Sequence, residues 1–76
     1  MLAREALTAE SIRRVLGKPG LTKVTIKDAV RLSGRHENTW YYRIRTGLID
    51  DPQGLPNTSR RGWEINYFAR WENANE

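Results

Sequence analysis

The chain has 76 residues, with 13 Lys and Arg against 9 Asp and Glu, and its net charge of +4 favours a polyanionic partner. It contains no cysteine, which excludes disulfides, thiolate metal ligands and a cysteine nucleophile. No apolar run approaches the roughly 20 residues that span a bilayer, and the N-terminus lacks the apolar centre of a signal peptide. We therefore expect a soluble, cytoplasmic, single-domain protein (1–76).

Residues 1–20 are predicted to form an N-terminal helix and a turn. The helix pattern is clearest from Thr8, which can act as N-cap, to Gly17, which can end the helix. Its apolar residues on one face are Ile12, Val15 and Leu16. We expect this face to pack on the core. The alternative is a contact with another protein or, through Arg13 and Arg14, with a phosphate.

Residues 25–49 are predicted to form two short helices joined by a tight turn, after a short extended segment at 21–24. Thr25 can cap the first helix, and Asp28, three residues later, completes a variant of the capping box. Gly34 follows Ser33 and is expected to end this helix.

The second helix of this pair is predicted to begin near Glu37 or Asn38. Trp40 and Ile44 lie four residues apart and therefore share one face, which we expect to point inward. Gly47 can adopt the left-handed conformation that ends a helix. A helix, a glycine-bearing turn and a second helix form the helix-turn-helix pattern.

Residues 50–65 are predicted to form a loop and a strand. The loop is rich in Pro, Gly, Asn, Asp and Ser. The strand alternates, with Trp63 and Ile65 on one side and Glu64 on the other. Pairing of this strand with residues 48–50 would form a small hairpin.

Residues 66–72 are predicted to form the last helix, with Asn66 as its cap. Phe68 and Trp71 are three residues apart and are expected to face the core. Residues 72–76 are expected to be a frayed tail.

Residues 24–71 carry a set of features in a particular order. In order, the first features are a Thr-Ile pair at 25–26, an apolar-Ser-Gly turn, and a second helix that starts with Thr and an apolar residue. This helix has an aromatic and basic middle, and a Gly-Leu-Ile segment follows it. Gly62-Trp63-Glu64-Ile65 and a small helix with Phe68 and Trp71 follow. This order resembles the DNA-binding segment of MerR-type regulators and of the related AlpA-like and excisionase proteins of phages and mobile elements. The resemblance implies a mainly α fold with a small β-hairpin: a winged helix-turn-helix (25–49), a wing (50–65) and an extra N-terminal helix.

The resemblance also implies a function. The second half of the chain is similar to AlpA-like and excisionase proteins, and this favours an excisionase, or recombination directionality factor. Such proteins bind adjacent DNA sites cooperatively and bend DNA so that an integrase can excise the element. The chain ends at residue 76 without the long dimerisation helix of MerR-type regulators, so we expect head-to-tail contacts on DNA rather than a coiled-coil dimer. The expected partners are double-stranded DNA and an integrase, in a bacterial or phage-infected cell. A small transcriptional regulator and a protein-interaction module are the alternatives.

The candidate DNA contacts fall into three sets. The second helix would enter the major groove, and its candidate residues are Glu37, Asn38, Thr39, Tyr41, Tyr42 and Arg45. The candidate phosphate contacts are Lys27, Arg31, Arg35 and Arg43. The candidate wing contacts are Ser59, Arg60 and Arg61. The resembling proteins usually have an aliphatic residue where this chain has Arg35, so either the turn is displaced or Arg35 lies across the surface toward a phosphate.

The sequence offers little for catalysis. His36 is the single histidine, and an acid-base, nucleophilic or metal site needs a constellation of groups. We interpret it as a turn or N-cap residue. The adjacent carboxylates of Asp50 and Asp51 precede Pro52 and are interpreted as a solvated loop. We expect no enzyme activity, cofactor, metal or small-molecule substrate.

Overall fold

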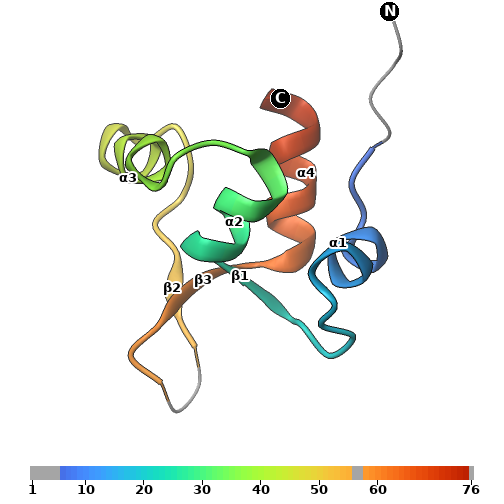
Figure 1. Ribbon diagram of the computed structural model, residues 1–76. Helices are drawn as coiled ribbons and strands as arrows, with labels where there is room; N and C mark the ends of the chain where they lie inside the picture. Colours follow the sequence, from blue (N-terminus) through green and yellow to red (C-terminus); the bar gives the residue numbers. More distant parts are fainter. Residues whose placement is uncertain (1–5, 56–57, 76) are drawn as a thin grey trace, which may run out of the picture.

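The computed structural model describes residues 6–55 and 58–75, and these form a small, mainly helical unit (Figure 1). Within them lie four helices and three strands. In chain order these are α1 (Ala9–Leu16), β1 (Lys23–Thr25), α2 (Ile26–Ser33), α3 (Glu37–Thr46), β2 (Gln53–Gly54), β3 (Arg61–Glu64) and α4 (Ile65–Asn75). In the view of Figure 1, α1 and α3 lie at opposite ends, with α2 and α4 between them.

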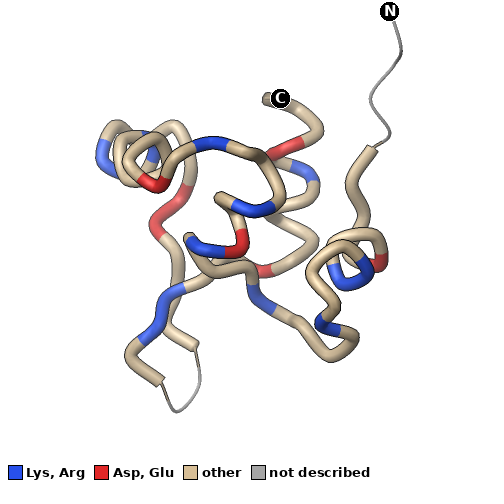
Figure 2. The backbone as a smooth tube through the Cα atoms, in the orientation of Figure 1, with Lys and Arg blue, Asp and Glu red and all other residues tan. Residues whose placement is uncertain are grey.

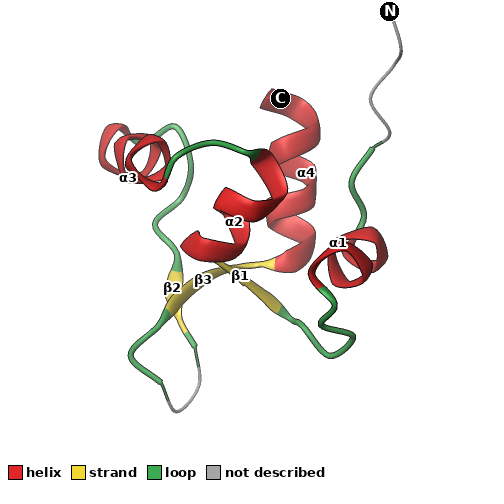
Figure 3. Ribbon diagram, viewed as in Figure 1, coloured by secondary structure: helices red, strands yellow, loops and turns green. Residues whose placement is uncertain are grey.

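The three strands form an antiparallel sheet with the order β1-β3-β2 (Figure 3). Gly62 in the central strand pairs with Thr25 of β1 on one side and with Gln53 of β2 on the other. A Cβ atom at position 62 would lie 3.0 Å from the carbonyl oxygen of Val24. Glycine therefore allows the close approach of β1 and β3.

Trp40 is the centre of the core and is fully buried. Its ring centroid lies 5.6 Å from that of Trp63, 5.4 Å from that of Phe68 and 5.7 Å from that of Trp71. Trp63 belongs to β3, and Phe68 and Trp71 belong to α4, so Trp40 connects α3 to both of these elements. The other buried apolar residues are Ile12, Leu16, Val24, Ala29, Ile49, Ile65 and Ala69.

The predicted helix boundaries of α1, α2 and α3 are confirmed. Thr8 and Thr25 each accept a hydrogen bond from the backbone N–H three residues later and form capping boxes. The three helices end at glycines with positive φ, which are Gly17, Gly34 and Gly47. These signals are local, which is why the sequence alone reveals them.

Helix α1 packs on the core through Ile12 and Leu16, as predicted. Residues 1–5 of the predicted N-terminal segment lie outside the residues that the structure describes. The expected burial of Val15 is wrong, since its side chain is 59% exposed. It precedes Leu16 and so lies about 100° around the helix from it. The main chain of Leu7 also exchanges two hydrogen bonds with the Asn73 side chain of α4.

The predicted strand partner of β3 is wrong: β3 pairs with residues 53–54 rather than with 48–50. The backbone of residues 48–50 has other partners. The indole N–H groups of Trp71 and Trp63 donate to the carbonyl oxygens of Leu48 and Asp50, at 2.9 and 2.6 Å. The Asp50 N–H donates to the Tyr67 hydroxyl at 3.0 Å. The segment is therefore held by core side chains, and the strand forms after it.

The predictions for the last helix need two corrections. Helix α4 begins at Ile65, and the Glu64 carboxylate accepts a hydrogen bond from the Asn66 N–H at 2.7 Å, so Glu64 rather than Asn66 provides the capping side chain. The helix also continues to Asn75, whereas residues 72–76 were expected to fray. Glu72 is fully buried, and Asn73 bonds to Leu7, so this last turn has tertiary contacts.

Candidate nucleic-acid interface

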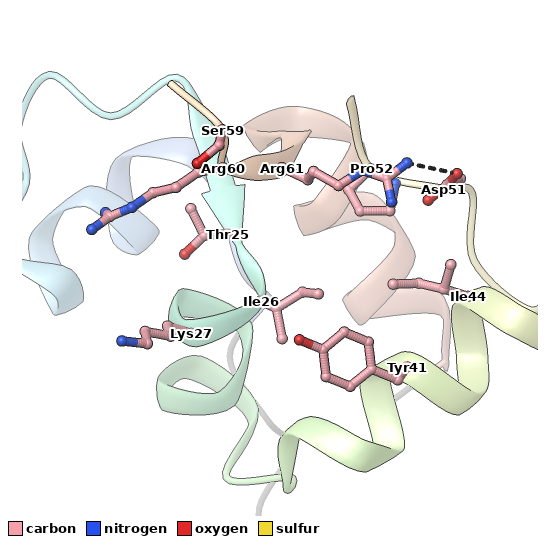
Figure 4. A pocket seen from close by; sticks show the side chains of 10 residues that line it. All are labelled: Thr25, Ile26, Lys27, Tyr41, Ile44, Asp51, Pro52, Ser59, Arg60 and Arg61. Atoms are coloured by element: carbon pink, nitrogen blue, oxygen red, sulfur yellow. Dashed lines mark hydrogen bonds and ion pairs between the residues drawn. The ribbon is translucent and has the colours of Figure 1, made fainter. Parts of the chain in front are cut away.

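A groove of about 370 Å³ lies between the start of α2, one face of α3 and the β2–β3 hairpin (Figure 4). Ile26, Ile44 and Pro52 provide apolar surface inside it. Lys27 and Arg60 stand at its rim, and their side chains extend to the same side of the molecule in Figure 4. We call this feature the basic groove.

The facing of α3 follows from Trp40. Because this side chain points into the core, the opposite side of the helix is exposed, including Asn38, Tyr41 (51%), Tyr42 (53%) and Arg45. Tyr41 also lines the basic groove. Glu37 is exposed and Thr39 is half-buried. The exposed candidates of α3 thus provide amide, hydroxyl, carboxylate and guanidinium groups, which can bond to base edges and phosphates.

Arg43 occupies a different position from the other candidate phosphate contacts. Its guanidinium carbon lies 4.6 Å from the ring centroid of Trp40 and 5.0 Å from that of Trp71. The side chain is half-buried, and one of its guanidinium nitrogens is buried. Arg43 therefore attaches α3 to α4 through cation–π contacts, and we leave it out of the candidate interface.

The hairpin is bonded to β1 and is closed by a backbone hydrogen bond between its own arms. Lys23 donates from Nζ to the Gly54 carbonyl at 3.1 Å, and the Leu55 N–H donates to the Arg60 carbonyl at 2.7 Å. Arg61 forms an ion pair with Asp51 at 3.0 Å, with both side chains more than half exposed. Arg60 and Arg61, which are adjacent in sequence, thus differ: Arg60 extends to the same side as Lys27 in Figure 4, whereas Arg61 turns to the Asp51 carboxylate.

The remaining basic candidates are Arg31, in the last turn of α2, and Arg35, in the turn between α2 and α3, and both are exposed. Arg35 directly follows Gly34, and its N–H donates to the Ser33 hydroxyl at 3.0 Å. Helix α2 thus ends at Gly34 as predicted, and Arg35 lies at the surface instead of packing under α3. Figure 2 shows basic positions on α2, on this turn, on α3 and on the hairpin.

His36 is the N-cap of α3, as interpreted from the sequence. Its Nδ1 accepts a hydrogen bond from the Asn38 N–H at 3.1 Å. The residue also borders a second hollow, of about 380 Å³, together with Lys27, Val30, Arg31 and Glu37. Its position at a helix start was visible in the sequence, but this hollow was not.

Two further observations concern the described residues only. None of their helices combines the length and apolarity that crossing a membrane requires. Among them, no three His, Asp or Glu side chains gather where they could hold a metal ion.

Comparison with known proteins gives no family assignment. No protein-family model, curated protein or solved structure matches this chain.

Proposed function

We propose that this protein binds double-stranded DNA as a winged helix-turn-helix domain. In this proposal α2 and α3 are the helix-turn-helix, α3 enters the major groove, and the β2–β3 hairpin is the wing. The observation that carries the proposal is the basic groove, where Lys27 from α2 and Arg60 from the hairpin extend to the same side. A phosphodiester backbone between a major and a minor groove has the charge and shape to lie there.

The roles of the α3 side chains follow from their position along the helix. The N-terminal residues of a recognition helix usually reach base edges, so Asn38 is assigned to an adenine edge and Glu37 to a cytosine amino group. Arg45 lies later in the helix and is assigned to a phosphate. Tyr41 and Tyr42 offer hydroxyls to phosphates and rings to thymine methyl groups.

We further propose that the protein is an excisionase-type recombination directionality factor, whose copies bind adjacent sites head to tail, bend the DNA and assist an integrase. This finer assignment depends on the sequence resemblance. A small transcriptional regulator would use the same surface and would differ in the arrangement of its sites. A protein-interaction module is favoured by one observation, the half-exposed rings of Tyr41 and Tyr42 on α3.

Selection from a random pool of DNA duplexes at moderate salt tests these proposals. Direct repeats about one helical turn apart would support cooperative binding on one face of the duplex. An inverted repeat would favour a dimeric regulator. No enrichment by the folded protein would contradict specific DNA binding and leave the protein-interaction module as the better proposal.

The dependence of binding on salt gives a quantitative prediction. About five basic residues are assigned to phosphates: Lys27, Arg31, Arg35, Arg45 and Arg60. Because each phosphate contact contributes about 0.9 to the slope of log K against log salt, we expect a slope of about −4 to −5. Fluorescence anisotropy titrations over a range of salt concentrations would measure it. A slope near −1 would contradict a surface of this extent.

Replacing Asp51 with asparagine is expected to strengthen DNA binding. Asp51 lines the basic groove and holds Arg61 in an exposed ion pair. Asp51→Asn removes a negative charge beside the expected phosphate and releases Arg61 toward it. For a charge about 6 Å away in water, we expect binding at low salt to be about threefold tighter.

The matched control is Glu10→Gln, which removes the same charge from an exposed position on α1. We expect this variant to bind nearly as the wild type does. An equal gain in both variants would attribute the effect to net charge alone. Weaker binding by Asp51→Asn would show that the ion pair holds the hairpin in its binding position.

A further inference from the structure

One of the two ring nitrogens of His36 forms a hydrogen bond within the protein. Nδ1 accepts the Asn38 N–H at 3.1 Å, which is the cap of α3. A ring nitrogen that accepts a hydrogen bond carries no hydrogen. In the neutral imidazole the hydrogen is therefore on Nε2, and the cap fixes the ring as an Nε2–H donor.

The surroundings of this ring are basic. His36 is exposed and borders the second hollow, of about 380 Å³, with Lys27 and Arg31 of α2. Lys27 also lines the basic groove. One lysine thus lies between two neighbouring hollows, and the basic border continues from Arg60 past Lys27 to Arg31 and the imidazole.

We propose that His36 donates a hydrogen bond from Nε2–H to a DNA backbone phosphate while its Nδ1 caps α3. This inference rests on the proposed function and adds a contact to it. The phosphate lies in the second hollow, and Lys27 and Arg31 balance its charge. The strand that occupies the basic groove then continues past Lys27, so that successive phosphates contact the two hollows.

The carboxylate of Glu37 favours a phosphodiester over a free anion as the ligand of the second hollow. Its carboxylate borders the same hollow and repels a small anion that nothing else positions. A phosphate within a duplex is placed by all the other contacts, and the carboxylate can meanwhile accept a hydrogen bond from a cytosine amino group. The ligand of this hollow is therefore a backbone phosphate of duplex DNA.

The experiment compares His36→Ser and His36→Ala with the wild type on a duplex recovered from the random pool. Serine retains an oxygen that can cap α3 but has no donor at the position of Nε2. We expect His36→Ser to melt as the wild type does and to bind about tenfold more weakly, since it loses a hydrogen bond to a charged group. His36→Ala, which loses both contacts, should also melt at a lower temperature.

Two readouts separate this contact from an ordinary basic contact. A neutral donor releases no counterion, so the salt slope of His36→Ser should equal that of the wild type, whereas Lys27→Ala should lower its magnitude by about 0.9. Single methylphosphonate substitutions along the duplex should reveal one phosphate whose neutralisation weakens the wild type more than it weakens His36→Ser, which retains Lys27 and Arg31 but lacks the imidazole. The nitrogen resonances of His36 should also report the Nε2–H form.

Equal binding by His36→Ser and the wild type would overturn the inference and leave the proposed function intact. An Nδ1–H ring would overturn it too. Saturable perturbation of the His36 resonances by inorganic phosphate alone would identify a small-anion site and overturn the duplex assignment. Absence of DNA binding by the folded wild-type protein would instead overturn the proposed function, and this inference with it.

Discussion

Trp40→Ala is expected to destabilise the domain strongly and to lower its melting temperature. Trp40 is fully buried and contacts the rings of Trp63, Phe68 and Trp71. Truncating a buried tryptophan costs about 3–5 kcal/mol, and a domain of this size is expected to be stable by only about 4–11 kcal/mol in total. The truncation also removes one of the two rings over which Arg43 lies.

Thermal melting followed by circular dichroism would measure the effect. A loss of 1 kcal/mol lowers the melting temperature of a domain this small by about 4–8 °C, so we expect a decrease of at least about 12 °C. The control is Tyr42→Ala, which truncates an exposed ring of the same helix (53%) and should cost less than about 1 kcal/mol. A cooperative melt of Trp40→Ala near the wild-type temperature would show that α3 faces the core differently.

Reversing the charges at the rim of the basic groove is expected to abolish most DNA binding. Lys27→Glu/Arg60→Glu replaces two cations that extend to one side of the groove by two anions. Two phosphate contacts are lost and repulsion is added, so we expect binding at low salt to weaken by at least about 100-fold, with the salt slope falling to about −2 to −3. Both side chains are exposed, so the fold should persist.

The matched control is Arg14→Glu/Arg70→Glu. It changes the net charge by the same amount at exposed positions on α1 and α4 that do not line the basic groove. Its binding should weaken several-fold at most, through the general field of the protein. An equal loss in both double variants would mean that the attraction depends on net charge and that the groove has no particular role.

The sequence predicted the helices well because their limits depend on residues close together in the chain. Thr25 and Asp28 are three residues apart, and Gly34 and Gly47 directly follow the helices that they end. Trp40 and Ile44 share a helix face by simple periodicity. The facing of α3, and with it the exposure of Asn38 and Arg45, followed from the same local rule.

Two of the errors concern contacts between distant residues. The position of β2 depends on Leu48 and Asp50, whose carbonyls are bound by indoles 23 and 13 residues away. The last turn of α4 depends on Asn73 and its bonds to Leu7.

The other two errors are local. Val15 lies beside Leu16 but off the buried face of α1. Glu64 is a strand residue, as predicted, and its carboxylate also caps α4 by bonding to Asn66, two residues later.

In the candidate interface, too, contacts between distant residues are the part that the sequence does not reveal. Arg43 and Arg61 carry the charge expected of phosphate contacts. Trp40 lies three residues before Arg43 on the same helix, but the partners that come from other parts of the fold are not evident from the sequence. Their partners are the ring of Trp71 on α4 and the carboxylate of Asp51 across the hairpin. Lys27 and Arg60 were predicted as separate contacts, and only the fold brings them to one groove.

Gly62 has a mechanical consequence for the groove. This residue pairs with Thr25, which caps α2, and with Gln53 in the hairpin. The separation between the helix that carries Lys27 and the hairpin that carries Arg60 is therefore set by main-chain pairing through β3, in which Gly62 has little room for a Cβ. This pairing fixes the main-chain positions of the two segments, so that the flexible side chains of Lys27 and Arg60 are the parts that can adjust to a ligand between them.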